Sequence, residues 1–432
     1  MMPLTHLTQT HIARGFSRAV YRACPRAFSM PFSMASSLAI APAISLAVTL
    51  ATASLPGAAI AQPRDAVERT SRVTAPVKTA GASSASASAK KRNGRRSAAT
   101  AATTAATTAT TAAAASQPAY GARADVVAFS QDVAQRRGLD PQWVQAQLAQ
   151  ARRLPAVQRL IMPPPAGTAK NWAAYRARFI DRARIEGGLR FWRTHASWLE
   201  RAQARWGVPP EVVVAVIGVE TFYGRHMGTF RVLDALATLS FDFPSGRSDR
   251  SAFFREELEA LLALAAREGL EAGHWRGSYA GAMGLPQFMP GSLTRWAVDF
   301  DEDGHLDLHT SAADAIGSVA HYLAAFGWRS DLPTHYSVAA PVDTRDRAAL
   351  LGPDILPTFT PAQFAERGAE LPPEARSHEG LLALVELQNG EAAPSFVAGT
   401  SNFYVVTRYN WSAYYAMAVI DLSRELRQAR TP

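Results

Sequence analysis

One apolar segment limits the folds open to this chain more than any other part of its sequence. Residues 212–219 read Val-Val-Val-Ala-Val-Ile-Gly-Val, and Glu220 follows directly. A helix that is apolar on nearly every side is buried in a protein core. Pro209 and Pro210 precede the segment, and proline is well tolerated at the start of a helix. We therefore expect a central helix that carries one carboxylate at its C-terminal end.

The position of Glu220 indicates an unusual carboxyl group. Burial disfavours the charged form, so it raises the pKa of a carboxyl group. A glutamate with an ordinary pKa of about 4.3 can reach about 6 in an active site. Such an acid can protonate a leaving oxygen at neutral pH, as cleavage of a glycosidic bond requires. A glutamate that caps the helix or pairs with Arg225 would show the same local pattern, so both interpretations stay open.

Helical patterns cover most of the chain after Asp125, which predicts a mainly α protein. Asp140 is a suitable N-cap and Pro141 a suitable first residue for one helix. A second pattern, at about 182–206, places its apolar residues on one face. Further helices are expected at about 252–268, 290–298, 312–327 and 414–426. Residues 334–400 differ, because proline and glycine separate short β-prone pieces, and we expect a small, partly β insertion there.

The N-terminal part of the chain carries its excess positive charge. Residues 1–118 contain thirteen Lys and Arg against two acidic residues, a net charge of +11, whereas the whole chain has +9. The remainder therefore has a net charge of −2. Binding to nucleic acid requires basic residues clustered on the folded part. We expect no nucleic-acid partner.

Residues 1–61 have the pattern of a secretory signal peptide. An apolar run at 38–55 follows Arg-rich sequence and leads to Ala59-Ile60-Ala61, a typical cleavage site. A membrane anchor is the alternative, although two prolines and many small residues make a weak spanning helix. The single cysteine, Cys24, precedes this site. We expect a periplasmic protein, soluble after cleavage near Ala61 and free of disulfides.

Residues 62–120 are almost entirely Ala, Thr, Ser and basic residues. A segment with so few large apolar side chains cannot offset the entropy lost on ordering. We expect this segment to be a disordered tether.

Several motifs, in order along the chain, resemble one enzyme family. They are Val216 to Gly224 (VIGVETFYG), 231–239, 277–284, 287–290 and 407–410. Together they resemble the membrane-bound lytic transglycosylase B family of the lysozyme-like superfamily, whose members cleave peptidoglycan. The resemblance covers most of residues 125–425. It implies a lysozyme-like α+β catalytic core, formed by 206–333 and 401–432, with an N-terminal helical region at 121–205 and the insertion at 334–400.

The resemblance also implies that Glu220 is the single catalytic residue. Most glycosidases use two carboxylates, and substrate-assisted enzymes are an exception. In this family the N-acetyl group of muramic acid is thought to stabilise the anomeric centre. Glu220 would protonate the glycosidic oxygen and then deprotonate the C6 hydroxyl of the same sugar, which leaves a 1,6-anhydromuramyl end. A muramidase-type hydrolase with the same glutamate, or a non-catalytic peptidoglycan-binding protein, are the alternatives.

Carried over position by position, further residues match those that line the family's cleft. An amide side chain can both donate to and accept from acetamido and hydroxyl groups. The matching residues are Ser278, Gln287, Asn410 and Tyr415. Three tyrosines could pack on sugar rings or serve the core, namely Tyr223, Tyr279 and Tyr409. Leu285-Pro286 replaces the family's usual Tyr-Gly before the glutamine, which leaves the contacts of Gln287 open.

An acidic loop predicts a calcium site. Carboxylates at alternate positions with a glycine at the turn are typical of EF-hand loops. The twelfth position is Thr310 instead of the usual glutamate, and an acidic surface turn is the alternative. The resembled family closes a longer loop with a later aspartate. The expected ligands are Asp299, Asp301, Asp303, the backbone carbonyl of His305, and Asp314.

The expected cofactor is thus a structural Ca²⁺, with no organic cofactor. The expected partners are peptidoglycan glycan strands and, in addition, proteins of cell-wall synthesis or division. We expect the chain to act as a monomer.

Overall fold

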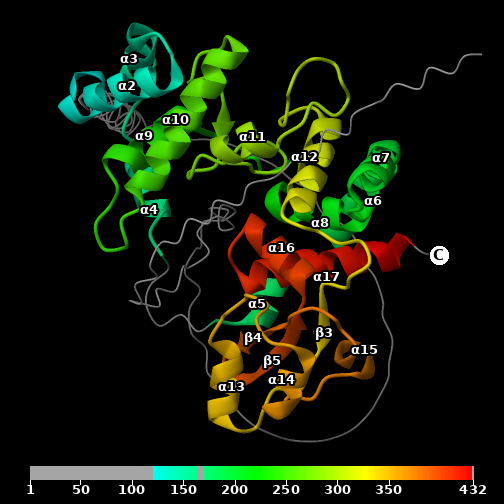
Figure 1. Ribbon diagram of the computed structural model, residues 1–432. Helices are drawn as coiled ribbons and strands as arrows, with labels where there is room; N and C mark the ends of the chain where they lie inside the picture. Colours follow the sequence, from blue (N-terminus) through cyan, green and yellow to red (C-terminus); the bar gives the residue numbers. More distant parts are fainter. Residues whose placement is uncertain (1–119, 164–169, 431–432) are drawn as a thin grey trace, which may run out of the picture. The chain divides into compact units, whose positions relative to one another are not determined.

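The computed structural model describes residues 120–163 and 170–430 (Figure 1). The predicted signal peptide, and the predicted tether up to residue 119, lie outside the described residues. Where described, the chain is mainly helical, as the sequence predicted, and it contains two small antiparallel sheets. None of the described helices combines the length and the apolar character that crossing a membrane requires.

The buried core surrounds helix α8 (Pro210–Thr221). Val213 to Ile217 are completely inaccessible to solvent, which confirms the predicted central helix. Neighbouring helices contact it over most of its surface. These are α6 (Arg182–Thr194), α7 (Ala196–Trp206), α12 (Ala312–Ala325) and α17 (Ala413–Arg430). α16 (Ser401–Tyr409) packs on α17.

The helix predicted at 182–206 is divided in two by His195, which corrects the sequence interpretation. His195 has φ −116° and ψ 27°, outside the helical region, so α6 ends before it and α7 begins after it. Its ring packs on Phe191 with a centroid distance of 4.6 Å. This contact turns the side chain toward the core. The apolar periodicity continues through His195, so the sequence pattern did not reveal that the helix is interrupted there.

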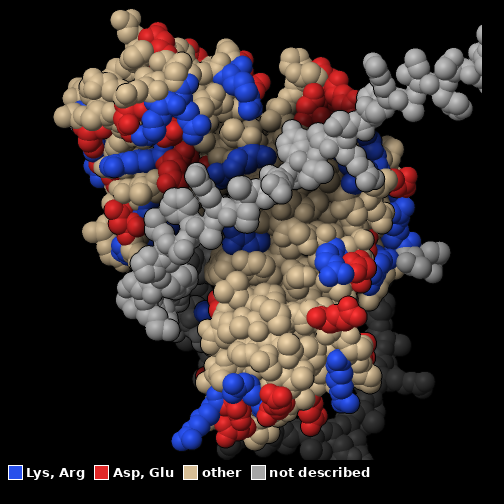
Figure 2. All heavy atoms as spheres, in the orientation of Figure 1, with Lys and Arg blue, Asp and Glu red and all other residues tan. Residues whose placement is uncertain are grey.

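A second group of helices comes from two separate parts of the chain. It comprises η1 (Tyr120–Ala122), α2 (Ala124–Arg137), α3 (Pro141–Ala149), α4 (Pro155–Leu160), α9 (Val232–Phe241) and α10 (Ser251–Glu268). Asp140 accepts a hydrogen bond from the Gln142 backbone N–H, as expected of an N-cap. Figure 2 shows side chains of both charges interspersed over this part of the molecule. In the same group of helices, Arg136 and Arg137 of α2 pair with Glu259 of α10.

Short elements connect the two groups of helices. β1 (Phe230–Arg231) pairs antiparallel with β2 (Arg276–Gly277), so Arg231 lies opposite Arg276. α11 (Pro290–Trp296) contacts both α10 and α12, and α5 (Trp172–Arg176) packs on α17.

A three-stranded antiparallel sheet lies within the segment predicted as an insertion. Its order is β3 (His335–Ser337), β5 (Ala392–Gly399), β4 (Ala383–Asn389). Alternate residues of β4 face opposite sides of a sheet, and Val385 belongs to the main core whereas Leu384 belongs to a second buried cluster. Three short helices complete this region, α13 (Thr344–Leu351), α14 (Pro361–Glu366) and α15 (Pro373–Arg376). The domain boundaries stay a prediction.

Candidate active site

Glu220 lies in the last turn of α8 and contacts a tyrosine from the far end of the chain. The Tyr415 hydroxyl, on α17, donates a hydrogen bond to Glu220 Oε1 at 2.6 Å. Glu220 is half-buried, so an incoming molecule can reach it, but protein atoms surround most of it. Burial raises the pKa of Glu220 to about 7, although the hydrogen bond from Tyr415 opposes the shift. The carboxyl group can therefore hold or release a proton near neutral pH.

A strained turn fixes the end of this helix. Phe222 and Tyr223 have φ angles of 51° and 59°, and Gly224 follows with φ 88°. Left-handed conformations cost non-glycine residues about 1 kcal/mol or more each, so other contacts must hold them. Thr221 supplies such contacts, since its Oγ1 donates to the Leu285 carbonyl at 2.9 Å and accepts from the Gly224 N–H at 3.0 Å. The helix end is thereby fixed to the segment before Gln287.

The segment from Gly284 to Gln287 forms a tight turn with Gln287 at φ 50°. The Gln287 Nε2 donates to the carbonyls of Met227 and Gly284 at 3.1 and 2.9 Å. The Tyr409 hydroxyl donates to the Pro286 carbonyl at 2.5 Å. Leu285-Pro286 thus offers its backbone carbonyls to Thr221 and Tyr409. Because the Gln287 amide nitrogen is engaged, only its carbonyl oxygen is available to a ligand.

Aromatic rings form a stack beside Glu220. Tyr409 stacks on Tyr415 with a centroid distance of 6.2 Å and an interplanar angle of 13°. Tyr322, from α12, packs edge-on against Tyr409 at 4.9 Å, and its hydroxyl donates to the Arg408 carbonyl. Burial raises the pKa of Tyr409 and of Tyr415 well above the usual value, so both hydroxyls stay protonated. The sequence interpretation missed Tyr322, because its position in an apolar helical pattern is typical of a core residue.

Asn410 and Ser278 are buried polar residues with unused hydrogen-bonding capacity. Asn410 follows α16 and is 8% exposed, and its Nδ2 has no partner among the described residues. A buried polar group without a partner costs about 1–3 kcal/mol, which favours a ligand at this position. Ser278 Oγ accepts from the Ala282 N–H at 3.0 Å, which leaves its hydroxyl proton to be donated. Ser278 directly follows β2.

Tyr223 and Tyr279 are placed differently from the other tyrosines. The Tyr223 ring fills the space that side chains at Gly187, Gly188 and Gly218 would occupy, and it lies 5.7 Å from the Phe191 ring. Tyr279 is 3% exposed. The packing of Tyr223 against the three glycines and the burial of Tyr279 favour the core role that the sequence left as the alternative. The contacts described for these two tyrosines do not support a role in sugar stacking.

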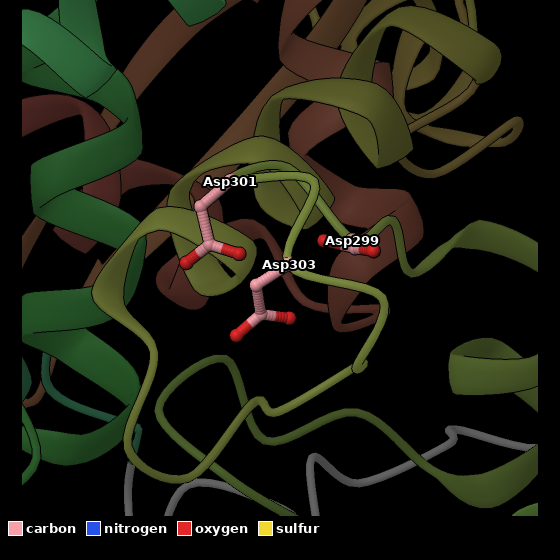
Figure 3. Close-up of side chains that lie close together, drawn as sticks. All are labelled: Asp299, Asp301 and Asp303. Atoms are coloured by element: carbon pink, nitrogen blue, oxygen red, sulfur yellow. The ribbon is translucent and has the colours of Figure 1, made fainter.

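The acidic loop gathers three of its predicted ligands. Carboxylate oxygens of Asp299, Asp301 and Asp303 lie within 4.8 Å of one another (Figure 3). One oxygen of Asp299 and one of Asp301 are buried without a hydrogen-bond partner in the described part of the chain. Buried carboxylate oxygens without donors are suited to a hard cation. The backbone N–H of His305 donates to Asp303 Oδ1, which keeps His305 beside the cluster.

Asp314 lies on the buried side of the acidic loop and binds its backbone. It is completely buried, and its two carboxylate oxygens accept from the backbone N–H groups of Phe300 and Asp307 at 2.7 and 2.8 Å. It lies outside the group of three, so its role as a ligand stays a prediction. The loop also reaches the turn beside Glu220, because the Leu285 N–H donates to the Leu308 carbonyl at 2.8 Å.

The chain is similar in sequence and in structure to known proteins. Residues 121–424 match the family model of the transglycosylase SLT domain. The membrane-bound lytic murein transglycosylase B of Escherichia coli K12 is 39% identical over 311 residues, which are 70% of this chain and 82% of that protein.

Three solved structures illustrate the structural similarity. Soluble lytic transglycosylase SltB1 of Pseudomonas aeruginosa has a TM-score of 0.64 and 38% identity, with 71% of this chain and all of that chain covered. E. coli Slt35 in complex with calcium has a TM-score of 0.61 and 36% identity, with coverages of 72% and 95%. P. aeruginosa SltB3 in complex with NAG-NAM-pentapeptide has a TM-score of 0.58 and 30% identity, with coverages of 69% and 78%.

Proposed function

The chain belongs to the transglycosylase SLT family, as a lytic transglycosylase acting on peptidoglycan, and on that premise we propose its reaction. The enzyme cleaves the β-1,4 bond between N-acetylmuramic acid and N-acetylglucosamine and leaves 1,6-anhydromuramyl ends. The observation that carries this proposal is Glu220, a carboxyl group whose pKa is raised to about 7 and which the Tyr415 hydroxyl holds in place.

In the first step, Glu220 acts as an acid. Its proton passes to the glycosidic oxygen, the bond from that oxygen to C1 breaks, and the bonding electrons stay with the oxygen. The acetamido oxygen of the same muramic acid bonds to C1 and takes the place of a second carboxylate. Because Tyr415 donates to Oε1, the carboxylate left behind is stabilised, and Oε2 is free to exchange the proton.

In the second step, Glu220 acts as a base. The carboxylate removes the proton of the C6 hydroxyl, whose oxygen bonds to C1 as the bond from C1 to the acetamido oxygen breaks. Glu220 is protonated again, and no water is consumed. A pKa near neutrality suits a group that must both give and take a proton in one cycle.

We propose that the substrate binds to polar side chains whose hydrogen-bonding capacity is not satisfied within the described residues. Asn410 Nδ2 and the Ser278 hydroxyl would donate to acetamido or hydroxyl oxygens, and Gln287 would accept through its side-chain carbonyl. The half-buried Tyr409 would form the wall beside the sugar that is cleaved. Tyr415 is completely buried and would act through the hydrogen bond from its hydroxyl to Glu220. Gln287 to alanine or Asn410 to alanine should raise KM for glycan strands.

A structural Ca²⁺ is proposed for the acidic loop. Asp299, Asp301 and Asp303 would supply carboxylate oxygens, with the His305 carbonyl and Asp314 as further ligands. The buried oxygens without donors at Asp299 and Asp301 support this, and so does the calcium complex of the related E. coli Slt35. When bound, the ion would neutralise the clustered charge and hold the loop closed.

The cellular setting is proposed from the N-terminal sequence. Residues 38–61 would direct export, with cleavage after Ala61 and release into the periplasm, where the enzyme would act as a monomer with proteins of wall synthesis or division. N-terminal sequencing of the mature protein from cell extracts tests the cleavage site.

Mass spectrometry of the products released from purified sacculi tests the reaction. We expect anhydro ends from the wild type and no products from Glu220→Gln. Glu211→Gln, at the opposite end of α8, is the matched control and should retain activity. Reducing ends, which are heavier by one water, would instead establish a muramidase. Absence of products from the wild type would refute the proposed reaction and leave a peptidoglycan-binding protein as the alternative.

A further inference from the structure

A cavity of about 610 Å³ lies apart from Glu220, between α3, the C-terminal end of α10 and the β1–β2 ribbon. Its wall includes Trp143, Leu270, Glu271, Arg231 and Arg276. This volume is within the range of small-molecule and short-peptide sites. None of the residues assigned to the proposed reaction lines it. We refer to it below as the arginine cavity.

Two arginines give the arginine cavity its charge. Arg231 and Arg276 are directly opposed on the antiparallel ribbon, where like charges destabilise a strand pair. Asp234 is the nearest acid to Arg231, with a distance of 3.6 Å to its Nε, and it lies behind the wall at 6% exposure. Arg276 is exposed and has no carboxylate partner within salt-bridge distance in the described part of the chain. Arg276 is therefore the arginine that a bound anion would meet without a competing carboxylate at salt-bridge distance.

Both arginines are held by neutral groups of the backbone. The Arg231 Nη2 donates to the Gln150 carbonyl at 3.1 Å, and the Arg276 Nη1 donates to the Gly273 carbonyl at 3.0 Å. These hydrogen bonds orient both guanidinium groups. Arg231 also forms an ion pair with Asp234, whereas Arg276 has no carboxylate at salt-bridge distance among the described residues. Pre-oriented arginines bind carboxylates well, because the planar guanidinium can form two parallel hydrogen bonds.

The remaining wall is partly apolar and carries one fixed acid. Trp143 and Leu270 present apolar surface, and Leu270 is 38% exposed. Glu271 Oε2 accepts from the side chains of Gln147 and Gln150 at 2.6 and 2.9 Å. Among the described residues, Glu271 forms no ion pair with either arginine. The cavity therefore combines the exposed Arg276, an Arg231 that pairs with Asp234, the carboxylate of Glu271 and an apolar wall. A short peptide with free carboxylates, an amino group and small aliphatic side chains has the complementary chemistry.

We propose that the arginine cavity binds the stem peptide of a peptidoglycan strand whose glycan occupies the cleft at Glu220. This inference rests on the proposed function. Arg276 on β2 is two residues before Ser278, which is about 7 Å along an extended strand. The segment from Arg276 to Ser278 thus joins the cavity to a residue that is proposed to bind the glycan. Because the stem peptide is attached to the glycan, a strand bound at Ser278 can place its peptide near the cavity.

Paired substrates test the proposal on the full chain. Glycan strands carrying stem peptides are compared with the same strands after an amidase has removed the peptides. Arg276→Gln should raise KM for the peptide-bearing strands about tenfold, the loss of roughly one charge-assisted contact, and leave KM for the bare strands unchanged. Arg276→Lys, which keeps the charge, should recover much of the discrimination. Arg190→Gln on the exposed face of α6 is the matched control.

A direct binding measurement tests the proposal even if the Arg276→Gln variant fails to fold. Free stem tetrapeptide is titrated into Glu220→Gln, and Trp143→Ala in that background should weaken binding. Equal KM changes on both substrates, or no saturable binding of the tetrapeptide, would overturn the inference. Those results would leave cleavage by the wild type intact. Failure of the proposed function would instead appear as no cleavage of either substrate.

Discussion

Replacing Glu220 by glutamine should stabilise the folded protein at neutral and alkaline pH and have little effect in acid. Burial raises the pKa of Glu220 from 4.5 to about 7. Between these two values the folded state holds a proton that the unfolded state has released. The free energy of unfolding of the wild type therefore falls as pH rises through this window. The contribution is fully present below pH 4.5 and is lost above pH 7.

The size of the effect follows from the shift. A difference of about 2.5 pKa units, at 1.36 kcal/mol per unit, amounts to about 3 kcal/mol. Glutamine is neutral at every pH and can still accept the hydrogen bond of the Tyr415 hydroxyl, so it reproduces the protonated acid. Glu220→Gln should thus match the wild type near pH 4.5 and exceed it by about 3 kcal/mol at pH 8.

Urea unfolding at pH 4.5, 6 and 8 measures this difference, and subtraction of the wild-type curve removes all titrations that the two proteins share. Glu211→Gln, on the same helix, controls for the loss of a carboxylate that pairs with Arg427 and has no contact with Tyr415. A stability difference that stays constant across the three pH values would refute the reasoning, because it would show that Glu220 titrates alike in the folded and unfolded states.

Three further changes have outcomes that the contacts specify. Tyr415→Phe removes the hydrogen bond that favours ionised Glu220, so the alkaline limb of the pH–rate profile should move up by about 1 unit, and an unmoved limb contradicts the role. Thr221→Val leaves the Leu285 carbonyl without its donor and should cost about 1–3 kcal/mol in thermal unfolding, whereas Thr221→Ser should cost much less. Added Ca²⁺ should raise the Tm of the wild type more than that of Asp303→Asn, and equal shifts would count against the loop as the binding site.

The sequence alone was sufficient to locate the centre of the fold. An eight-residue apolar run has no arrangement other than burial, so α8 and the position of Glu220 at its end followed from local physics. Asp140 was equally informative, because an N-cap interacts with residues only a few positions away. The acidic loop could also be predicted from a local pattern, because its carboxylates are close in sequence.

Contacts between segments that are distant in the sequence could not be predicted from local sequence patterns. Tyr415 is 195 residues from Glu220, and only the resemblance to a family suggested that it belongs near the same cleft. Tyr322 and Thr221 have no distinguishing neighbours, and their contacts depend on how α12 and the Leu285 turn pack. The break at His195 and the enclosure of Tyr223 among three glycines also arise from tertiary packing.

A hydrogen bond from the Leu285 N–H to the Leu308 carbonyl joins the acidic loop to the turn that precedes Gln287. A change of loop length near Leu308 would therefore shift the turn that carries Gln287, whereas a change at Asp303 or Gly304 would disturb the carboxylate cluster and leave that hydrogen bond in place. Homologous enzymes should accordingly keep the number of residues between the cluster and Leu308 constant.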